Sequence, residues 1–198
     1  MLEQTLRHHY QRILVDPLLS RLSNRITPLA LTGLSGLLGL LCVPCLLLQK
    51  PFLAISSLLL SGYLDTLDGS LARFQGKSSD FGSAMDIIVD RIVEFAVILA
   101  FYLSNPIHNG LPALLMSGSI LLCITSFLVV GIFTNNTTHK SFHYSPGLME
   151  RAEAFIFFIV MILCPEYFNP LAGLFCILVC FTAFLRMLEF KKNCARIS

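Results

Sequence analysis

The sequence predicts an all-α integral membrane protein with six transmembrane helices, preceded by an amphipathic helix in the membrane interface. Three observations support this fold class. Hydrophobic residues make up 55% of the 198 residues and charged residues only 13%, whereas a soluble domain carries about 25% charged residues. The apolar residues fall into six runs, most of them close to the roughly 20 residues that span a bilayer as a helix. The basic residues gather on one side of the resulting topology.

The first element, residues 1–25, is a basic amphipathic segment. Its apolar residues recur at nearly helical spacing at Leu2, Leu6, Tyr10, Leu14, Leu18 and Leu22. Four arginines lie between them, at positions 7, 12, 21 and 25. Such a helix lies along the membrane surface. The segment is polar and basic overall and the apolar run that follows it is too long for the core of a signal peptide, so no cleavable signal peptide is expected.

The six apolar runs occupy residues 28–190. The first run covers residues 28–48, and the second begins at residue 51 and ends in the Asp-rich stretch that starts at residue 65. The other four cover residues 82–103, 111–133, 148–164 and 170–190. Proline and glycine mostly mark their ends, but Pro44 lies inside the first run and predicts a kink there. Because no internal repeat or second domain is visible, residues 1–198 are expected to form a single domain.

The distribution of positive charge orients these helices. Of the fourteen Lys and Arg residues, only Lys50 falls on the side that also holds the connections at 104–110 and 165–169. The others lie with both termini and with the turns at 74–81 and 134–146. By the positive-inside rule, both termini and the Asp-rich stretch face the cytoplasm. We therefore expect a multi-pass protein of the cytoplasmic (inner) membrane.

Residues 65–90 hold the candidate chemistry. The first part places two carboxylates, two small residues and one guanidinium on a single helical face: Asp65, Asp68, Gly69, Ala72 and Arg73. After a short polar turn, Gly82, Asp86 and Asp90 share one face of the next helix because they are spaced by four residues. Two such helices would bring four aspartates together.

Four neighbouring aspartates repel one another unless cations lie between them. Carboxylate oxygens suit Mg²⁺ or Mn²⁺ better than zinc, so Asp65, Asp68, Asp86 and Asp90 predict a site for two divalent ions. Two such ions clamp the oxygens of a phosphoryl group during in-line displacement. A carboxylate inside a membrane helix costs at least about 2.5 kcal/mol on insertion scales, which also favours a functional role. We expect a phosphate-containing substrate reached from the lipid headgroup region.

The pattern Asp-x₂-Asp-Gly-x₂-Ala-Arg-x₈-Gly-x₃-Asp-x₃-Asp resembles the signature of the CDP-alcohol phosphatidyltransferase family. Every fixed position is matched, at Asp65, Asp68, Gly69, Ala72, Arg73, Gly82, Asp86 and Asp90. The resemblance implies six membrane helices, usually in a homodimer, and a role in phospholipid biosynthesis. Such an enzyme displaces CMP from CDP-diacylglycerol with the hydroxyl of a small alcohol. Its partners are then lipid substrates and the membrane, with no nucleic acid.

The resemblance also implies a role for each position. Asp65, Asp68 and Asp86 would hold the metals, and Asp90 would lie near them and act as general base on the attacking hydroxyl. The CDP moiety would be cradled by Gly69, Ala72, Arg73 and Gly82. The chain departs from the family's N-terminal pattern Pro-Asn-x-x-Thr, because it reads Pro28-Leu29-Ala-Leu-Thr32 and lacks the asparagine.

The acceptor alcohol is suggested by further similarities. Asp90-Arg91-Ile-Val-Glu94 resembles the inositol and inositol-phosphate branches, and Gly147-Leu-Met-Glu150-Arg151 is similar to a Glu-Arg element of the inositol-phosphate branch. Three cations are predicted at the cytoplasmic ends of the last three helices and could converge on an acceptor phosphate: Lys140, Arg151 and Arg186. A phosphorylated acceptor, inositol phosphate or glycerol 3-phosphate, is therefore favoured over inositol or serine. The alternatives are a salt bridge for Arg91 with Glu94 and membrane anchoring for Lys140 and Arg186.

A divalent-cation transporter would also place carboxylates in membrane helices. Its site is expected near the bilayer midplane on broken helices. Here the aspartates lie at predicted cytoplasmic ends, and they are accompanied by Gly69, Ala72 and Arg73, which cation transport does not require. The enzyme is therefore the preferred interpretation.

Overall fold

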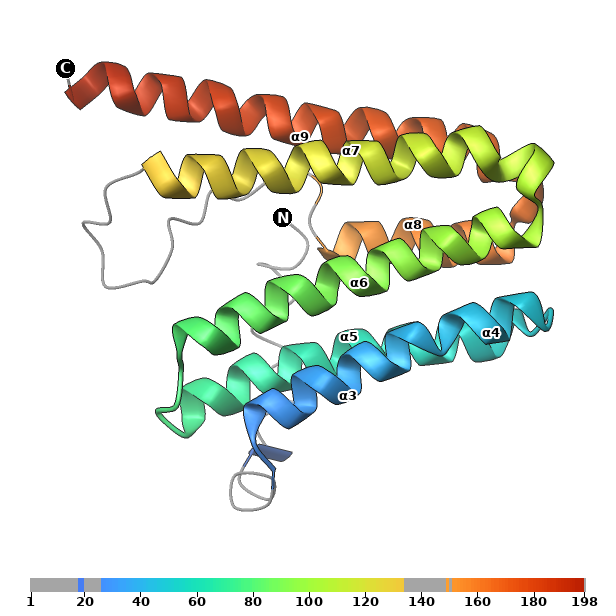
Figure 1. Ribbon diagram of the computed structural model, residues 1–198, viewed down its shortest axis with the longest axis horizontal. Coiled ribbons are helices and arrows are strands. Elements are labelled where there is room, and N and C mark those ends of the chain that lie inside the picture. Colours follow the sequence, from blue (N-terminus) through green and yellow to red (C-terminus); the bar gives the residue numbers. More distant parts are fainter. Residues whose placement is uncertain (1–17, 20–25, 134–148, 150, 198) are drawn as a thin grey trace. The chain divides into compact units, whose positions relative to one another are not determined.

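The computed structural model describes residues 18–19, 26–133, 149 and 151–197. Every regular element within these ranges is a helix, as the fold class predicts (Figure 1). The helices are α3 (Pro28–Leu40), α4 (Cys42–Leu47), α5 (Pro51–Phe74), α6 (Asp80–Ser104), α7 (Pro106–Phe133), α8 (Arg151–Leu163), the 3₁₀ helix η2 (Pro165–Tyr167) and α9 (Phe168–Ile197). The amphipathic helix predicted over 1–25 lies outside the described residues, apart from Leu18 and Leu19, which are helical.

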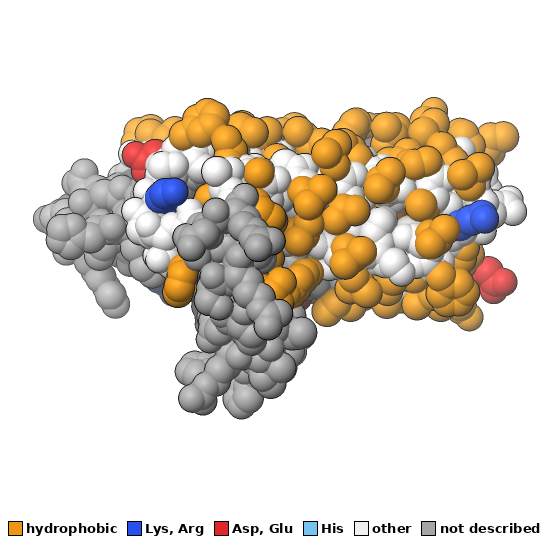
Figure 2. Space-filling model, turned by 90° about the horizontal axis from the view of Figure 1, so that it is seen from below, with side chains coloured by type: hydrophobic (Ala, Val, Ile, Leu, Met, Phe, Trp, Pro, Cys, Tyr) orange, Lys and Arg blue, Asp and Glu red, His pale blue; other side chains and the backbone are white. Residues whose placement is uncertain are grey.

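Three described stretches are long and apolar enough to cross a membrane: Pro28–Leu47, Pro106–Phe133 and Pro165–Asn193. On the face seen in Figure 2, hydrophobic side chains cover most of the described surface, and the few charged side chains lie toward its ends. Such a surface fits contact with lipid tails. The helices α5 and α6 have 24 and 25 residues, but both carry polar residues of the candidate site. Six spans and cytoplasmic termini stay predictions.

Proline determines two of the boundaries between helices. The kink predicted at Pro44 is confirmed, because the first run is divided into α3 and α4 at Leu41, since the nitrogen of Pro44 has no proton to donate to the carbonyl of Leu40. The predicted connection at 104–110 is wrong, because only Asn105 separates α6 from α7. Pro106 starts α7, a position that proline favours, and the helix continues through Pro112.

The chain packs as two compact units. One contains the helices from α3 to α6, and the other contains those from α7 to α9. In the first unit, residues 2–106, α3 packs against both α5 and α6. In the second, residues 107–198, α8 packs against α9, with the rings of Phe158 and Phe175 stacked 5.8 Å apart. The Asp-rich stretch belongs to the first unit. A single domain over residues 1–198 stays a prediction.

Glycines let α3 approach α6 closely. Both Gly36 and Gly39 are buried. A Cβ atom added to Gly36 would lie 2.8 Å from Val89 Cγ1, and one added to Gly39 would lie 2.5 Å from Val93 Cγ2. Because α3 also packs on α5, these two glycines set the separation of the helices that carry the aspartates.

We expect the variant Gly39→Ala to destabilise the protein by about 1–3 kcal/mol, because Val93 is completely buried and has no room to move. Gly33→Ala is the matched control on the same helix. No atom lies within 4 Å of a Cβ added there, and alanine is favoured over glycine in a helix by about 1 kcal/mol. Thermal unfolding in detergent measures both. Equal melting temperatures for the two variants would contradict close packing of α3 on α6.

Candidate functional site

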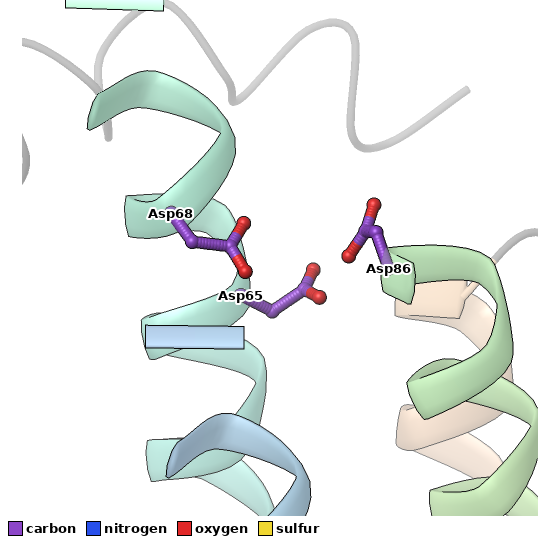
Figure 3. A group of neighbouring side chains, drawn as sticks. All are labelled: Asp65, Asp68 and Asp86. Carbon is purple, nitrogen blue, oxygen red and sulfur yellow. The ribbon is translucent and has the colours of Figure 1, made fainter. Parts of the chain in front are cut away.

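Three aspartates converge between α5 and α6. Asp65 and Asp68 project from α5 and Asp86 from α6, with their carboxylates facing one another (Figure 3). One oxygen from each lies within 4.8 Å of the others. Asp68 is buried, and Asp65 and Asp86 are half-buried. The structure thus brings together three of the four predicted metal ligands, which we call the Asp trio.

The turn between α5 and α6 explains this convergence. The chain leaves α5 through Gly76, whose φ of +64° lies in the left-handed region that glycine adopts without strain. The amide of Lys77 donates to the carbonyl of Ala72 at 2.9 Å, as expected for a glycine-terminated helix. The Ser79 side chain then caps α6 by accepting from the amide of Gly82 at 3.1 Å. The chain reverses within five residues, 75–79, which leads the start of α6 back toward the aspartates of α5.

The Asp trio fits a divalent cation. Its donors are all carboxylate oxygens, the ligands that Mg²⁺ and Mn²⁺ prefer. One of them, Asp86 Oδ1, is buried and has no hydrogen-bond donor among the described residues. A buried anionic oxygen in this state is costly, and a cation would satisfy it.

Asp90 lies one turn beyond Asp86 on α6 and is not part of the Asp trio. Its Oδ2 lies 4.0 Å from Nη2 of Arg91. The same guanidinium contacts the buried Glu94 at 2.6 Å through Nη1. The salt bridge considered for Arg91 and Glu94 is therefore present, and Asp90 as a fourth metal ligand stays a prediction.

A cavity of about 360 Å³ opens beside the Asp trio, a volume in the range of small-molecule sites. Asp68 and Asp86 line it. So do all four residues predicted to hold the CDP moiety: Gly69, Ala72, Arg73 and Gly82. Leu29, which stands where the family pattern has asparagine, also lines it.

The sequence analysis missed several polar residues of this cavity. They come from the start of α3 and from the region of the α5–α6 turn: Thr27, Lys77, Ser78, Ser79 and Ser83. The polar composition of residues 75–80, between two apolar helices, was the available signal. Lys77 adds a second cation to Arg73 in the cavity wall, so the cavity suits an anionic ligand.

The three cations predicted for an acceptor phosphate are only partly described. Lys140 lies outside the described residues. The guanidinium of Arg151 lies 5.2 Å from the ring centre of Phe155. Nη1 of Arg186 donates to the carbonyl of Cys123 on α7 at 3.0 Å. Both arginines belong to the second unit and the Asp trio to the first, so an acceptor pocket built from these cations stays a prediction.

Comparisons with known proteins match most of the chain. A family model described as CDP-alcohol phosphatidyltransferase matches residues 25–186. The chain is 32% identical over 169 residues to the inner membrane protein YnjF of Escherichia coli, and the aligned region covers 82% of each protein. It is 29% identical over 153 residues to phosphatidylinositol phosphate synthase of Corynebacterium glutamicum, covering 75% of this chain and 68% of that protein.

A solved structure also resembles the chain. It is the phosphatidylinositol phosphate synthase of Mycobacterium tuberculosis with CDP-DAG bound, at a TM-score of 0.66 and 19% identity, covering 88% of this chain and 92% of that one. The same enzyme has been solved with manganese and citrate. At this level of identity, the likeness shows a shared fold.

Proposed function

Because this chain belongs to the CDP-alcohol phosphatidyltransferase family and is therefore a transferase, we propose that it transfers phosphatidyl groups from CDP-diacylglycerol to a phosphorylated alcohol. The observation that carries this proposal is the cavity that joins Asp68 and Asp86 to Arg73 and the small residues Gly69 and Ala72. In this cavity, carboxylates that attract cations lie next to a surface that suits a nucleotide phosphate. Such an arrangement serves phosphoryl chemistry.

In the proposed reaction, the acceptor hydroxyl oxygen forms a bond to the phosphorus that carries diacylglycerol. The phosphoanhydride bond breaks and CMP leaves with its electron pair. Asp90 receives the hydroxyl proton. The family is divalent-metal dependent, and we assign two ions, Mg²⁺ or Mn²⁺, to the Asp trio together with Asp90. Bound ions neutralise the charge of the phosphoryl oxygens.

The nucleotide half of the donor is assigned to the part of the cavity lined by Gly69, Ala72, Arg73 and Gly82. Gly69 and Ala72 have little or no side chain, so a flat base or ribose can approach α5 closely. Arg73 offers a planar fork of donors to phosphate oxygens. Gly82 lies in the first turn of α6, where the helix dipole favours an anion.

The location of the Asp trio supports a membrane-surface reaction. Asp65 and Asp68 lie in the last three turns of α5, and Asp86 lies in the second turn of α6. A cation transporter would place its carboxylates near the midplane instead. We infer a single-domain, six-span inner-membrane homodimer with both termini and the site at the cytoplasmic surface. The name of the YnjF relative, an inner membrane protein, supports the location.

The acceptor we favour is an inositol phosphate. Two of the proteins that resemble this chain are phosphatidylinositol phosphate synthases by name. Lys140, Arg151 and Arg186 are the cations we assign to its phosphate. Glycerol 3-phosphate and serine remain the alternatives for the same reaction.

CMP release by the purified protein tests the proposal. CDP-diacylglycerol and Mn²⁺ or Mg²⁺ are supplied with inositol 1-phosphate, glycerol 3-phosphate, inositol or serine in parallel. We expect release with inositol 1-phosphate and only background with inositol, because the acceptor phosphate supplies the binding energy. CMP release with glycerol 3-phosphate alone, or with serine alone, would refute inositol phosphate as the acceptor. No release with any of the four, in folded protein that binds metal, would overturn the proposed function for this donor and these acceptors.

A further inference from the structure

We propose that Thr32 on α3 is a positioning residue for the metal site, an inference that rests on the proposed function. Its hydroxyl Oγ1 donates a hydrogen bond to Oδ2 of Asp68. Thr32 is 5% exposed and Asp68 4%, so little water reaches this bond. A helix that contributes no carboxylate to the Asp trio thus controls the orientation of one of its members.

The hydroxyl of Thr32 has a second possible acceptor, whose hydrogen bond is lost when the hydroxyl donates to Asp68. Oγ1 of Thr32 also lies 3.2 Å from the carbonyl of Pro28, the usual acceptor for threonine within a helix. A hydroxyl has one proton, so donation to Asp68 forgoes the bond to Pro28. A hydrogen bond to a charged carboxylate is about twice as strong as one between neutral groups. The carboxylate of Asp68 is therefore the preferred acceptor, and one of its oxygens is held toward α3.

The register that brings Thr32 to Asp68 is fixed at several points. Thr27 caps the start of α3 by accepting from the amide of Ala30 at 3.3 Å, and Pro28 occupies the first turn. Leu31 belongs to a buried cluster with Leu67 and Leu71, the neighbours of Asp68 on α5. Farther along α3, Gly36 and Gly39 allow the close approach described above. The hydrogen bond is thus formed between two helices whose relative position is already determined.

Thr32 also lines the cavity together with Asp68. Its position suits an outer-shell partner, which fixes a ligand carboxylate before the ion binds. Removing such a partner typically weakens metal binding by 10–100-fold. A threonine that served only to pack α3 against α5 would instead be replaced by valine, its isostere, with no effect on metal affinity.

The test measures Mn²⁺ binding to the purified protein by calorimetry, without substrates. We expect Thr32→Val to raise the dissociation constant about 10–100-fold and Thr32→Ser, which keeps the hydroxyl, to remain within about threefold of the wild-type value. Thr66→Val is the matched control on α5, because its hydroxyl donates to the backbone carbonyl of Gly62 at 3.0 Å and it does not line the cavity. This control should bind Mn²⁺ as the wild type does.

The outcomes separate this inference from the proposed function. Wild-type affinity in Thr32→Val overturns the positioning role, whatever its activity. A parallel rise in the Mn²⁺ concentration for half-maximal CMP release, with an unchanged KM for CDP-diacylglycerol at saturating Mn²⁺, supports it. If Thr32→Val does not fold, Thr32→Ala is measured against Thr32→Ser with the same criteria. If the wild-type protein binds Mn²⁺ but releases no CMP, the proposed transferase reaction is refuted. The effect of the Thr32 variants on Mn²⁺ affinity would still test the positioning role.

Discussion

The variant Asp86→Asn is expected to lose CMP release and to bind Mn²⁺ at least about a hundredfold more weakly. Asp86 is the only member of the Asp trio that comes from α6, so an ion held between α5 and α6 depends on it. Asparagine keeps the size of the side chain but removes the negative charge. Loss of an outer-shell partner already costs 10–100-fold in affinity, and loss of a charged direct ligand should cost more.

The same variant should behave in the opposite way without metal. In metal-free protein, three carboxylates with oxygens within 4.8 Å of one another repel. Neutralising Asp86 relieves part of that repulsion, so metal-free Asp86→Asn should unfold at a higher temperature than the metal-free wild type. Thermal unfolding with EDTA and with Mn²⁺ measures both effects. A purely structural role for Asp86 predicts a lower temperature in both conditions.

Asp80→Asn is the matched control for these measurements. Asp80 lies in the first turn of the same helix, is exposed and does not line the cavity. We expect wild-type Mn²⁺ affinity and CMP release from it. Wild-type Mn²⁺ affinity in Asp86→Asn would refute the metal site that we assign to the Asp trio.

The convergence of the Asp trio followed from the sequence because it is a local consequence of helix periodicity. Asp65 and Asp68 share a helical face through their spacing alone, and the polar residues before Gly82 indicated a turn that brings the next helix back. The reversal also requires a residue at left-handed φ, which Gly76 provides. Each of these features depends on neighbours within about one or two helical turns, where sequence patterns are informative.

Contacts between residues far apart in the sequence could not be predicted from local sequence patterns. The bond from Thr32 to Asp68 joins residues 36 positions apart, and it exists because α3 packs closely on both α5 and α6. Glycine spacing in α3 suggests a close helix contact without identifying the partner. Similarly, the sequence predicts Arg186 near an acceptor phosphate but does not show that its Nη1 donates to the carbonyl of Cys123 within its own unit. Which donor meets which acceptor is decided by tertiary packing.

Asp90→Asn is expected to reduce kcat for CMP release by about 10²–10⁴-fold, the usual contribution of a general base, while Mn²⁺ still binds. An amide has no basic oxygen that can take the acceptor's proton. Metal binding should persist because the oxygens that come within 4.8 Å of one another belong to Asp65, Asp68 and Asp86. Calorimetry with Mn²⁺ and CMP release from the same preparation measure the two properties separately.

Comparison with Asp86→Asn then assigns separate roles to two carboxylates four residues apart on one helix. Loss of activity with retained Mn²⁺ binding at Asp90, against loss of both at Asp86, is the pattern that the geometry predicts. An active Asp90→Asn variant would refute the general-base assignment. Loss of all Mn²⁺ binding in that variant would show that Asp90 is an essential metal ligand, and the proton acceptor would then have to be sought among the other groups near the acceptor hydroxyl.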